Sequence, residues 1–240
     1  MSILDRAVVF ACDFRPRVVG GIAVCPNHGR AGGAPAWLQL GDGVTASTFP
    51  APLSGYGATF DTGDYLIANV VDRYSASSQF WMYFYGLVRS STGIVYFWQS
   101  RDATQPNARG VGFGTTGAVP TLAIAGASGI DQTTGPAANR IQPRELCSWA
   151  VNFKGSSSAA SSMEYFLNGV NLGSGTVSSD TWNGDSIATG KSMLYGKYWN
   201  GAVPAGNTIA GNHIAIAFGD GLITPKDIAE IQVLLRRRVI

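Results

Sequence analysis

Glutamates and histidines, which often carry acid–base chemistry, are few in this chain and lie far apart. The sequence contains three glutamates, Glu145, Glu164 and Glu230, and two histidines, His28 and His213. No glutamate belongs to a Glu-x-Asp-x-x-Glu pattern, which would place an acid and a nucleophile on one face of a strand. The histidines are too isolated to suggest a metal site or a catalytic base. We therefore predict that the protein is not an enzyme, and a divergent glycosidase is the least favoured alternative.

Two loops in the C-terminal third have the composition of a sugar-binding surface. An exposed aromatic ring offers a flat apolar platform to a pyranose, while Asn and Asp side chains can bond its hydroxyl groups. Trp182 and Asn183 lie in one loop, and Tyr198, Trp199 and Asn200 in the other. We predict that these five residues form a glycan site. The alternative is that the aromatic rings alternate along strands and belong to the core.

The elements that would position these loops include a tight hairpin over residues 163–173. An Asn168-Gly169 pair separates two short apolar runs. Asn and Gly tolerate the positive φ that a two-residue type I′ turn requires at both central positions. The pair therefore predicts an antiparallel hairpin.

The chain continues into a last strand and one helix. Residues 213–218 alternate between apolar and other side chains, which is typical of a strand. Thr224 is a good N-cap, Pro225 suits the first helical position, and Asp227 carries a negative charge to the helix N-terminus. A short C-terminal helix is predicted from this point.

Further strands are predicted from apolar and aromatic runs. Residues 79–88 are so aromatic that both faces of the strand should be covered, and residues 93–100 are predicted to pair with them across a short turn. The other expected strands are 6–14, one beginning at 37–40, 120–125 and 146–153. Residues 102–143 are otherwise predicted to be irregular.

The order of these motifs resembles the concanavalin A-like jelly roll of the laminin-G and pentraxin type. In that family a Tyr-x-Asn-Gly hairpin precedes a last core strand and a short helix. The hairpin at Met163–Gly173 and the segment 213–235 have this order here, and Tyr56–Leu66 is similar to the family's early strand pair. The resemblance covers roughly residues 38–240. It implies an all-β sandwich with one short C-terminal α-helix, a fold that recurs in secreted lectins, adhesion proteins and bacteriophage virion proteins.

The same resemblance suggests one cofactor, Ca²⁺, because such domains often hold the ion at the rim of the sandwich with carboxylate and carbonyl oxygens. The candidate ligands here are Asp61 and Asp64 in one turn, and Asp180 and Asp185, with Asn183, in another. The alternative, which we favour, is that these residues form Asx-turns without a metal ion.

Composition and cysteine content indicate which partners the protein has and where it folds. The net charge of +2 is too balanced to imply a nucleic-acid partner, and no segment predicts membrane insertion. The three cysteines, Cys12, Cys25 and Cys147, are odd in number and without a pairing pattern, so we expect free thiols. Because no signal peptide is recognisable in the sequence, we expect the protein to fold in a host bacterial cytoplasm. We read residues 1–240 as one domain, with residues 1–36 forming a strand and an extended arm.

These features together favour a non-enzymatic structural or attachment protein of a bacteriophage virion, such as a capsid decoration or fibre-associated domain. Residues 103–143 are rich in Gly, Ala and Thr and too long for an idle loop, so we expect them and the N-terminal arm to contact other virion subunits or further copies of the chain. A cell-surface glycan is a further expected partner. The main alternative is a free carbohydrate-binding lectin.

Overall fold

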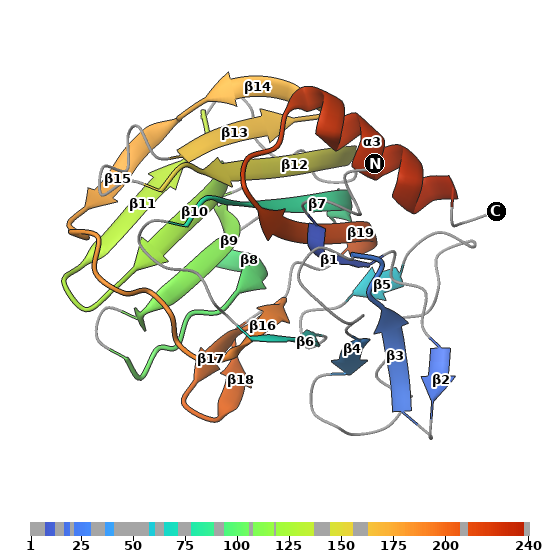
Figure 1. Cartoon of the computed structure of the whole chain (residues 1–240), viewed down its shortest axis with the longest axis horizontal. Helices are drawn as coiled ribbons and strands as arrows, with labels where there is room; N and C mark the ends of the chain where they lie inside the picture. The colour runs from blue at the N-terminus through green and yellow to red at the C-terminus, as the bar shows by residue number, and fades with distance from the viewer. Residues whose placement is uncertain are drawn as a thin grey trace.

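The computed structural model describes residues 8–12, 17–19, 22–29, 37–40, 58–60, 65–71, 78–88, 94–105, 108–117, 119–136, 145–155, 163–206 and 211–237. Its strands form two antiparallel sheets packed face to face, and one helix lies against the outer side of the smaller sheet (Figure 1). The predicted all-β sandwich with a C-terminal helix is therefore confirmed.

Within the described residues, the smaller sheet has seven strands. In spatial order they are β1 (Val8–Cys12), β19 (Gly211–Asp220), β7 (Phe80–Val88), β12 (Leu146–Phe153), β13 (Met163–Leu167) and β14 (Val170–Gly173), with β5 (Ala58–Phe60) also paired to β19.

The larger sheet has ten described strands. Their spatial order is β15 (Thr176–Asp180), β11 (Ile130–Thr134), β10 (Val119–Ala125), β9 (Gly110–Thr116), β8 (Ile94–Gln99), β16 (Ser192–Tyr195), β6 (Leu66–Val71), β4 (Trp37–Leu40), β3 (Ile22–Pro26) and β2 (Arg17–Val19). A separate hairpin of β17 (Tyr198–Asn200) and β18 (Val203–Ala205) lies near β16 (Figure 1).

Strand β7 has both faces covered, as its aromatic sequence predicts. Phe80, Met82 and Phe84 point into the core between the sheets, where Phe84 stacks on Phe97 of β8 with ring centroids 4.2 Å apart. The alternate residues Trp81 and Tyr83 point outwards and are buried under the helix. The predicted pairing of β7 with β8 is wrong, because β12 and β19 occupy both edges of β7 and β8 belongs to the other sheet.

The helix α3 (Pro225–Arg237) begins as predicted. Thr224 and Asp227 bond each other's backbone reciprocally, since the Thr224 N–H donates to Asp227 Oδ2 at 2.9 Å and the Asp227 N–H donates to Thr224 Oγ1 at 3.3 Å. This capping box satisfies donors that a helix N-terminus leaves unpaired. Ile228, Ile231 and Leu235 then pack onto the outer face of the seven-stranded sheet.

A buried tyrosine joins the two sheets. Tyr165 of β13 reaches across the core, where its hydroxyl donates to the Thr133 carbonyl at 2.6 Å and accepts from the Leu122 N–H at 2.9 Å. Burial raises the pKa of Tyr165 well above its ordinary value, so the hydroxyl stays protonated. The bonds satisfy polar groups of β10 and β11 that the core would otherwise leave unpaired.

The prediction that residues 102–143 are irregular outside 120–125 is wrong. Much of 102–143 is regular, because β9, β10 and β11 run side by side in the larger sheet and bury Val111, Phe113 and Leu122. The N-terminal arm likewise contains β2 and β3, which extend the same sheet beside β4. The described parts of both segments therefore pack within one chain, and the main structural reason to expect contacts with other subunits is lost.

Two of the three cysteines are described with their side chains. Cys12 and Cys147 are buried thiols that form no disulfide, as predicted, while the side chain of Cys25 lies outside the described residues. Burial raises the pKa of Cys147 to about 11, so this thiol is protonated at neutral pH.

The turn at Asn168-Gly169 is confirmed as a hairpin turn in which both residues have positive φ, 50° and 81°. Replacing Gly169 with Val puts a β-branched side chain in this conformation and should lower the free energy of unfolding by about 1–3 kcal/mol. Urea denaturation monitored by tryptophan fluorescence measures the change. Gly169→Asn is the matched control, since Asn tolerates positive φ and should cost clearly less. Equal costs for Val and Asn would contradict this reading of the turn.

Candidate functional site

The hairpin β17–β18 carries three of the predicted glycan-binding residues, Tyr198, Trp199 and Asn200. Its backbone is held by the segment that follows β8. The Trp199 N–H donates to the Arg101 carbonyl at 2.8 Å, and the Ala103 N–H donates to the Trp199 carbonyl at 2.8 Å. The hairpin is therefore fixed to the edge of the larger sheet by backbone bonds, not only by side-chain packing.

The Asp102 side chain stabilises the turn of this hairpin at Gly201. Its buried carboxylate accepts hydrogen bonds from the Gly201 N–H at 3.0 Å, the Thr104 N–H at 3.1 Å and the Thr104 hydroxyl at 2.8 Å. Burial acts to raise the pKa of Asp102, but these bonds and the nearby Lys191 ammonium outweigh it and lower the pKa. The carboxylate is consequently ionised at neutral pH and serves as a structural anchor.

Lys191 and Trp199 complete the underside of the hairpin. The Lys191 ammonium donates to the Gly201 carbonyl at 2.8 Å and lies 3.8 Å from Asp102 Oδ2 and 5.6 Å from the centre of the Trp199 ring. The indole N–H of Trp199 donates to the Ser192 carbonyl at 2.7 Å. Trp199 is therefore half-buried and held in place, and the Lys191 ammonium lies close to its ring.

Tyr198, the neighbour of Trp199, lines a pocket of about 130 Å³ together with Gln99, Arg101, Ala103 and Ala108. Pockets for drug-sized ligands are commonly about 300–1,000 Å³, so this one suits a single small group or one end of a sugar residue. The pocket thus lies where the end of β8 meets hairpin β17–β18.

Gln99 lines this pocket with a side chain that is almost fully buried. The residue is 2% exposed, and its Oε1 has no hydrogen-bond partner among the described residues. This oxygen lies over Gly112 of β9 and is buried, so a ligand in the pocket does not reach it. Gly112, directly opposite on β9, makes the position possible, because any side chain there would collide with the Gln99 amide.

Arg101 supplies the positive charge of the pocket. Its Nε–H donates to the Ala108 carbonyl at 3.2 Å, which holds the guanidinium group at the pocket wall. The described lining thus combines an aromatic ring, a cation and an amide side chain, and contains no carboxylate, thiol or imidazole. Such a set can bind a hydroxylated ligand.

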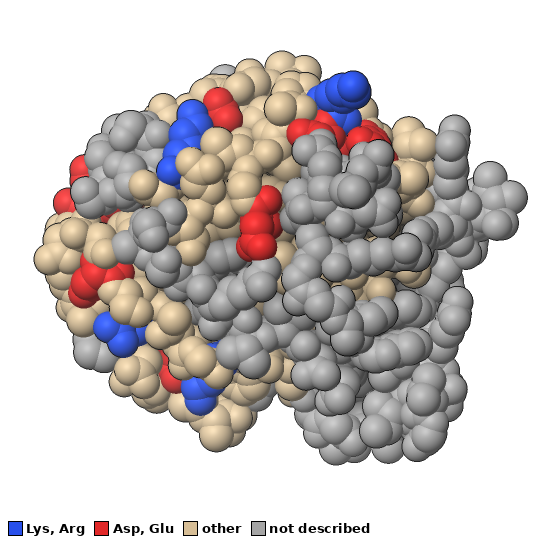
Figure 2. Space-filling model, in the orientation of Figure 1, with Lys and Arg blue, Asp and Glu red and all other residues tan. Residues whose placement is uncertain are grey.

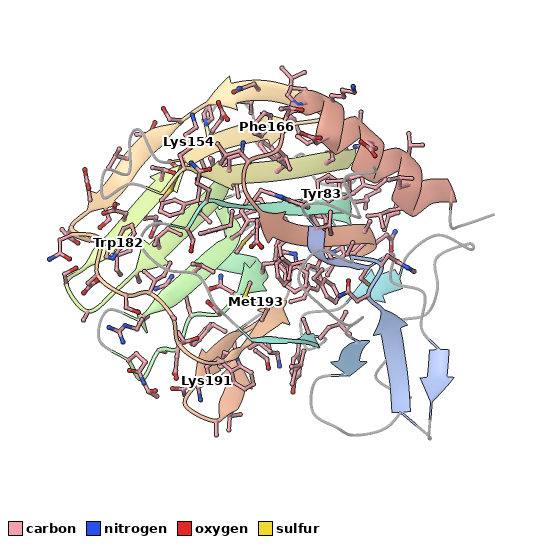
Figure 3. The ribbon with its side chains drawn as sticks, viewed as in Figure 1. Tyr83, Lys154, Phe166, Trp182, Lys191 and Met193 are labelled. Carbon is pink, nitrogen blue, oxygen red and sulfur yellow. The ribbon has the colours of Figure 1, made fainter. Side chains whose placement is uncertain are left out.

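The second predicted sugar-binding loop does not present its tryptophan. Trp182 is 2% exposed and packs in the core beside Phe153, with ring centroids 5.9 Å apart, so its predicted role as a sugar platform is wrong. Asn183 is exposed and accepts a hydrogen bond from the Asp185 N–H at 3.2 Å. Figure 3 shows Trp182 well apart from Lys191, which marks the hairpin, so the two loops do not form one site.

The predicted calcium ligands are not gathered into one described cluster. Asp61 and Asp64 lie outside the described residues. The Asp185 carboxylate accepts hydrogen bonds from the indole N–H of Trp182 at 2.8 Å and the Ser128 N–H at 2.8 Å. Within the part of the chain that the structure describes, no three His, Cys, Asp or Glu side chains could jointly hold a metal ion.

His213, the one histidine on the last strand, lies inside the sandwich. It is fully buried in β19, and its Nδ1 is 2.6 Å from the hydroxyl of Tyr195 on the opposite sheet. Burial raises the pKa of Tyr195 well above its ordinary value. This pair links the sheets as Tyr165 does, and it is too deeply buried to act on a substrate.

Charged side chains are interspersed over the described surface on the face in Figure 2, where Lys and Arg do not gather into an extended patch. This agrees with the balanced charge of the sequence. In addition, the described residues contain no helix with the length and apolar character of a membrane span.

Comparison with known proteins identifies the fold but no family. No protein-family model and no curated protein matches the sequence. The binding domain of botulinum neurotoxin serotype D superposes with a TM-score of 0.58 at 10% identity, covering 98% of this chain and 52% of that one. Botulinum neurotoxin type C, which depends on two ganglioside molecules to get into cells, gives 0.56 at 11% identity, with 98% and 52% covered.

A third structure is a carbohydrate-binding module, the CBM40 of Ruminococcus gnavus IT-sialidase bound to α2,3-sialyllactose. Its TM-score is 0.51 at 14% identity, and the match covers 74% of this chain and 96% of the module. At such identities the likeness establishes a jelly-roll-like β-sandwich. The chain spans about half the length of the toxin binding domains it matches.

Sequence reasoning missed Gln99 and Arg101. The sequence does contain a signal for them, because the aromatic run that ends at Trp98 continues as an extended segment. Alternation then puts Gln99 and Arg101 on one face of this segment and Ser100 and Asp102 on the other. What the sequence could not show is that hairpin β17–β18, almost 100 residues later in the chain, closes the pocket over them.

Asp131 generates a prediction about pH. This buried residue of β11 lies opposite Asp180 of β15, and its Oδ1 accepts the Trp182 N–H at 3.0 Å. Burial, assisted by the Asp180 charge, raises the pKa of Asp131 to about 6. The pKa of Asp in an unfolded chain is about 4, so between roughly pH 4 and 6 Asp131 is protonated in the folded protein and ionised in the unfolded chain. The contribution of Asp131 to the free energy of unfolding therefore falls as the pH rises through that window.

Urea denaturation of the wild type and Asp131→Asn at several pH values should reveal this contribution as a difference in slope between pH 4 and 6. Other carboxylates contribute equally to both proteins and cancel in the difference. Asp180→Asn removes the neighbouring charge and should give a smaller slope than the wild type. Parallel stability curves for all three proteins would refute the raised pKa.

Proposed function

We propose that this chain is a non-catalytic glycan-binding β-sandwich, and that its site is the pocket between the end of β8 and hairpin β17–β18. The single observation that carries the proposal is a pocket in which the ring of Tyr198 lies beside the polar side chains of Gln99 and Arg101. Sugars offer an apolar ring face and many hydroxyl groups, which match an aromatic ring with polar groups around it.

The comparisons support the same class of ligand. A carbohydrate-binding module of similar fold holds sialyllactose, and a toxin of similar fold interacts with gangliosides. Because identities are near 10–14%, this support concerns the kind of function that the fold hosts and not the position of the site.

Preorganisation of the hairpin also supports binding. Asp102, Lys191 and the backbone of Trp199 hold β17 before any ligand arrives. A prepositioned site loses less conformational entropy on binding, which matters for weakly bound sugars.

The attachment of this module to a bacteriophage virion remains part of the proposal, as does its localisation on the particle. The support for this part is the resemblance to the laminin-G and pentraxin type. The Gly-rich tract that was expected to contact other subunits no longer supports it, because most of its described residues pair within the larger sheet. The alternative is a free lectin. The two differ in an observable way, since a virion protein should co-sediment with phage particles from the native source and a free lectin should remain in the supernatant.

Tyr198→Ala tests the glycan site. Loss of the ring should weaken binding of any glycan that the wild type retains on a glycan array by about tenfold, because a stacked ring contributes about 1–1.5 kcal/mol. The dissociation constant of the selected glycan can be measured by calorimetry. Tyr198→Phe is the control that keeps the ring and should retain most of the affinity. Undiminished binding by a folded Tyr198→Ala variant would exclude this pocket as the site.

A further inference from the structure

Asn-Gly pairs are chemically labile, because the glycine nitrogen can attack the side-chain amide carbon of the asparagine and no Cβ on the glycine obstructs its approach. The chain contains three such pairs, and the structure describes all of them: Asn168-Gly169, Asn183-Gly184 and Asn200-Gly201. All three asparagines are exposed, so solvent reaches each pair. Hydrogen bonds therefore decide how readily each pair reacts.

The first pair is held by strand β12. Asn168 Oδ1 accepts the Ser148 N–H at 2.9 Å, and the Asn168 N–H donates to the Ser148 carbonyl at 2.9 Å. These two bonds fix both the side chain and the backbone of Asn168 in the hairpin turn. Rotation of the side chain onto the Gly169 nitrogen would break the first of them, which slows the reaction.

The third pair has an occupied nucleophile. The Gly201 N–H donates to Asp102 Oδ1 at 3.0 Å, and the Asp102 side chain is buried. The Gly201 nitrogen must lose this proton when it attacks Asn200. A negative carboxylate beside the nitrogen opposes the charge that it would then carry. The bond to Asp102 therefore protects Asn200.

The second pair differs from the other two in both respects. Asn183 Oδ1 accepts the Asp185 N–H at 3.2 Å, an Asx-turn that folds the Asn183 side chain over the Gly184 peptide. The same bond stabilises the negative charge that develops on Oδ1 when a nucleophile attacks the amide carbon. Among the described residues, none accepts a hydrogen bond from the Gly184 N–H. A free nucleophile thus lies beside an activated amide.

The carboxylate nearest to this pair in sequence is directed elsewhere. Asp185 Oδ1 accepts the indole N–H of Trp182 at 2.8 Å, and Asp185 Oδ2 accepts the Ser128 N–H at 2.8 Å. The Ser128 hydroxyl in turn accepts the Asn183 N–H at 3.1 Å. These bonds hold the loop in the Asx-turn conformation, and the attack on the amide carbon breaks none of them.

We infer that Asn183 is a site of spontaneous deamidation, selected by the fold from the three Asn-Gly pairs. The Gly184 nitrogen gives up its proton to a base in the solvent and bonds to Asn183 Cγ, the Cγ–Nδ2 bond breaks, and ammonia leaves. Water then opens the cyclic imide at either carbonyl group, which leaves aspartate or isoaspartate at this position. One water is consumed, one ammonia is released and one negative charge is gained.

This modification goes beyond the proposed function, because it acts away from the pocket. Isoaspartate carries the backbone through its side chain, so it lengthens the loop and removes the Asx-turn. The loop also ties β15 to β11, since the Trp182 N–H donates to the buried Asp131 at 3.0 Å. Figure 3 shows Trp182 well apart from Lys191, which marks the hairpin, so the change falls on a different edge of the larger sheet.

Timed incubation of the full, folded chain in a mildly alkaline buffer tests the inference. Mass spectrometry follows the peptide around each asparagine, with fragmentation that separates isoaspartate from aspartate. We expect the Asn183 peptide to convert about tenfold or more faster than the Asn168 and Asn200 peptides, which is the effect of about one hydrogen bond on a rate. The chain unfolded in guanidinium chloride is the control, in which the three pairs should convert at similar rates.

A pair of variants assigns the product in the folded chain. Asn183→Gln should remove most of the labelling by isoaspartyl methyltransferase, because the longer side chain closes the imide ring far more slowly. Asn200→Gln is the matched control and should retain the labelling of the wild type. The inference is overturned by equal conversion of the three pairs in the folded chain, by faster conversion of Asn168 or Asn200, or by an equal preference for Asn183 in the unfolded chain.

Discussion

The rest of this structure depends on a strand that must be buried on both faces. Strand β7 alternates Phe80, Met82 and Phe84 with Trp81, Tyr83 and Tyr85, so neither side tolerates water. The larger sheet covers one side and helix α3 covers the other. Since a buried aromatic side chain stabilises the fold by about 1.5–3 kcal/mol, leaving either face of β7 open would cost several such contributions. The helix is therefore an essential layer of the fold.

Polar links then set how the two sheets face each other. Apolar packing alone tolerates small shifts, whereas a buried hydroxyl with a definite partner does not. Tyr165 reaches β10 and β11 from the smaller sheet, and Tyr195 reaches His213 from the larger sheet. The two links run in opposite directions across the core, so sliding one sheet over the other would leave a polar group unsatisfied. Because Tyr195 ends β16, the same link also places the start of hairpin β17–β18.

Local features of the fold were predictable from the sequence, and long-range ones were not. The Asn168-Gly169 turn and the Thr224 cap depend on a few adjacent residues, and both are confirmed. The β9 strand was missed because Gly110, Gly112 and Gly114 read as loop residues. They occur on one face of β9, and a Cβ at Gly112 would force the Gln99 amide on the neighbouring strand to move, a contact that only the strand pairing shows.

The same limit applies to the candidate site. Tyr198 and Trp199 were found by their composition, and the structure leaves both half-exposed beside a pocket. Trp182 has an equally suitable sequence context, yet it is buried because Asp185 takes its indole N–H and Phe153 packs against its ring. An aromatic ring near Asn and Asp is therefore ambiguous by itself. The structure separates the two cases, because it buries Trp182 and leaves Trp199 half-exposed.

Alternation along the extended segment after β8 decides which polar groups at this sheet edge are structural. Ser100 and Asp102 turn inwards, where the Asp102 carboxylate holds the hairpin turn through the Gly201 N–H. Gln99 and Arg101 alternate with them and line the pocket. One sheet edge thus separates the structural carboxylate from the guanidinium at the pocket by a single peptide unit.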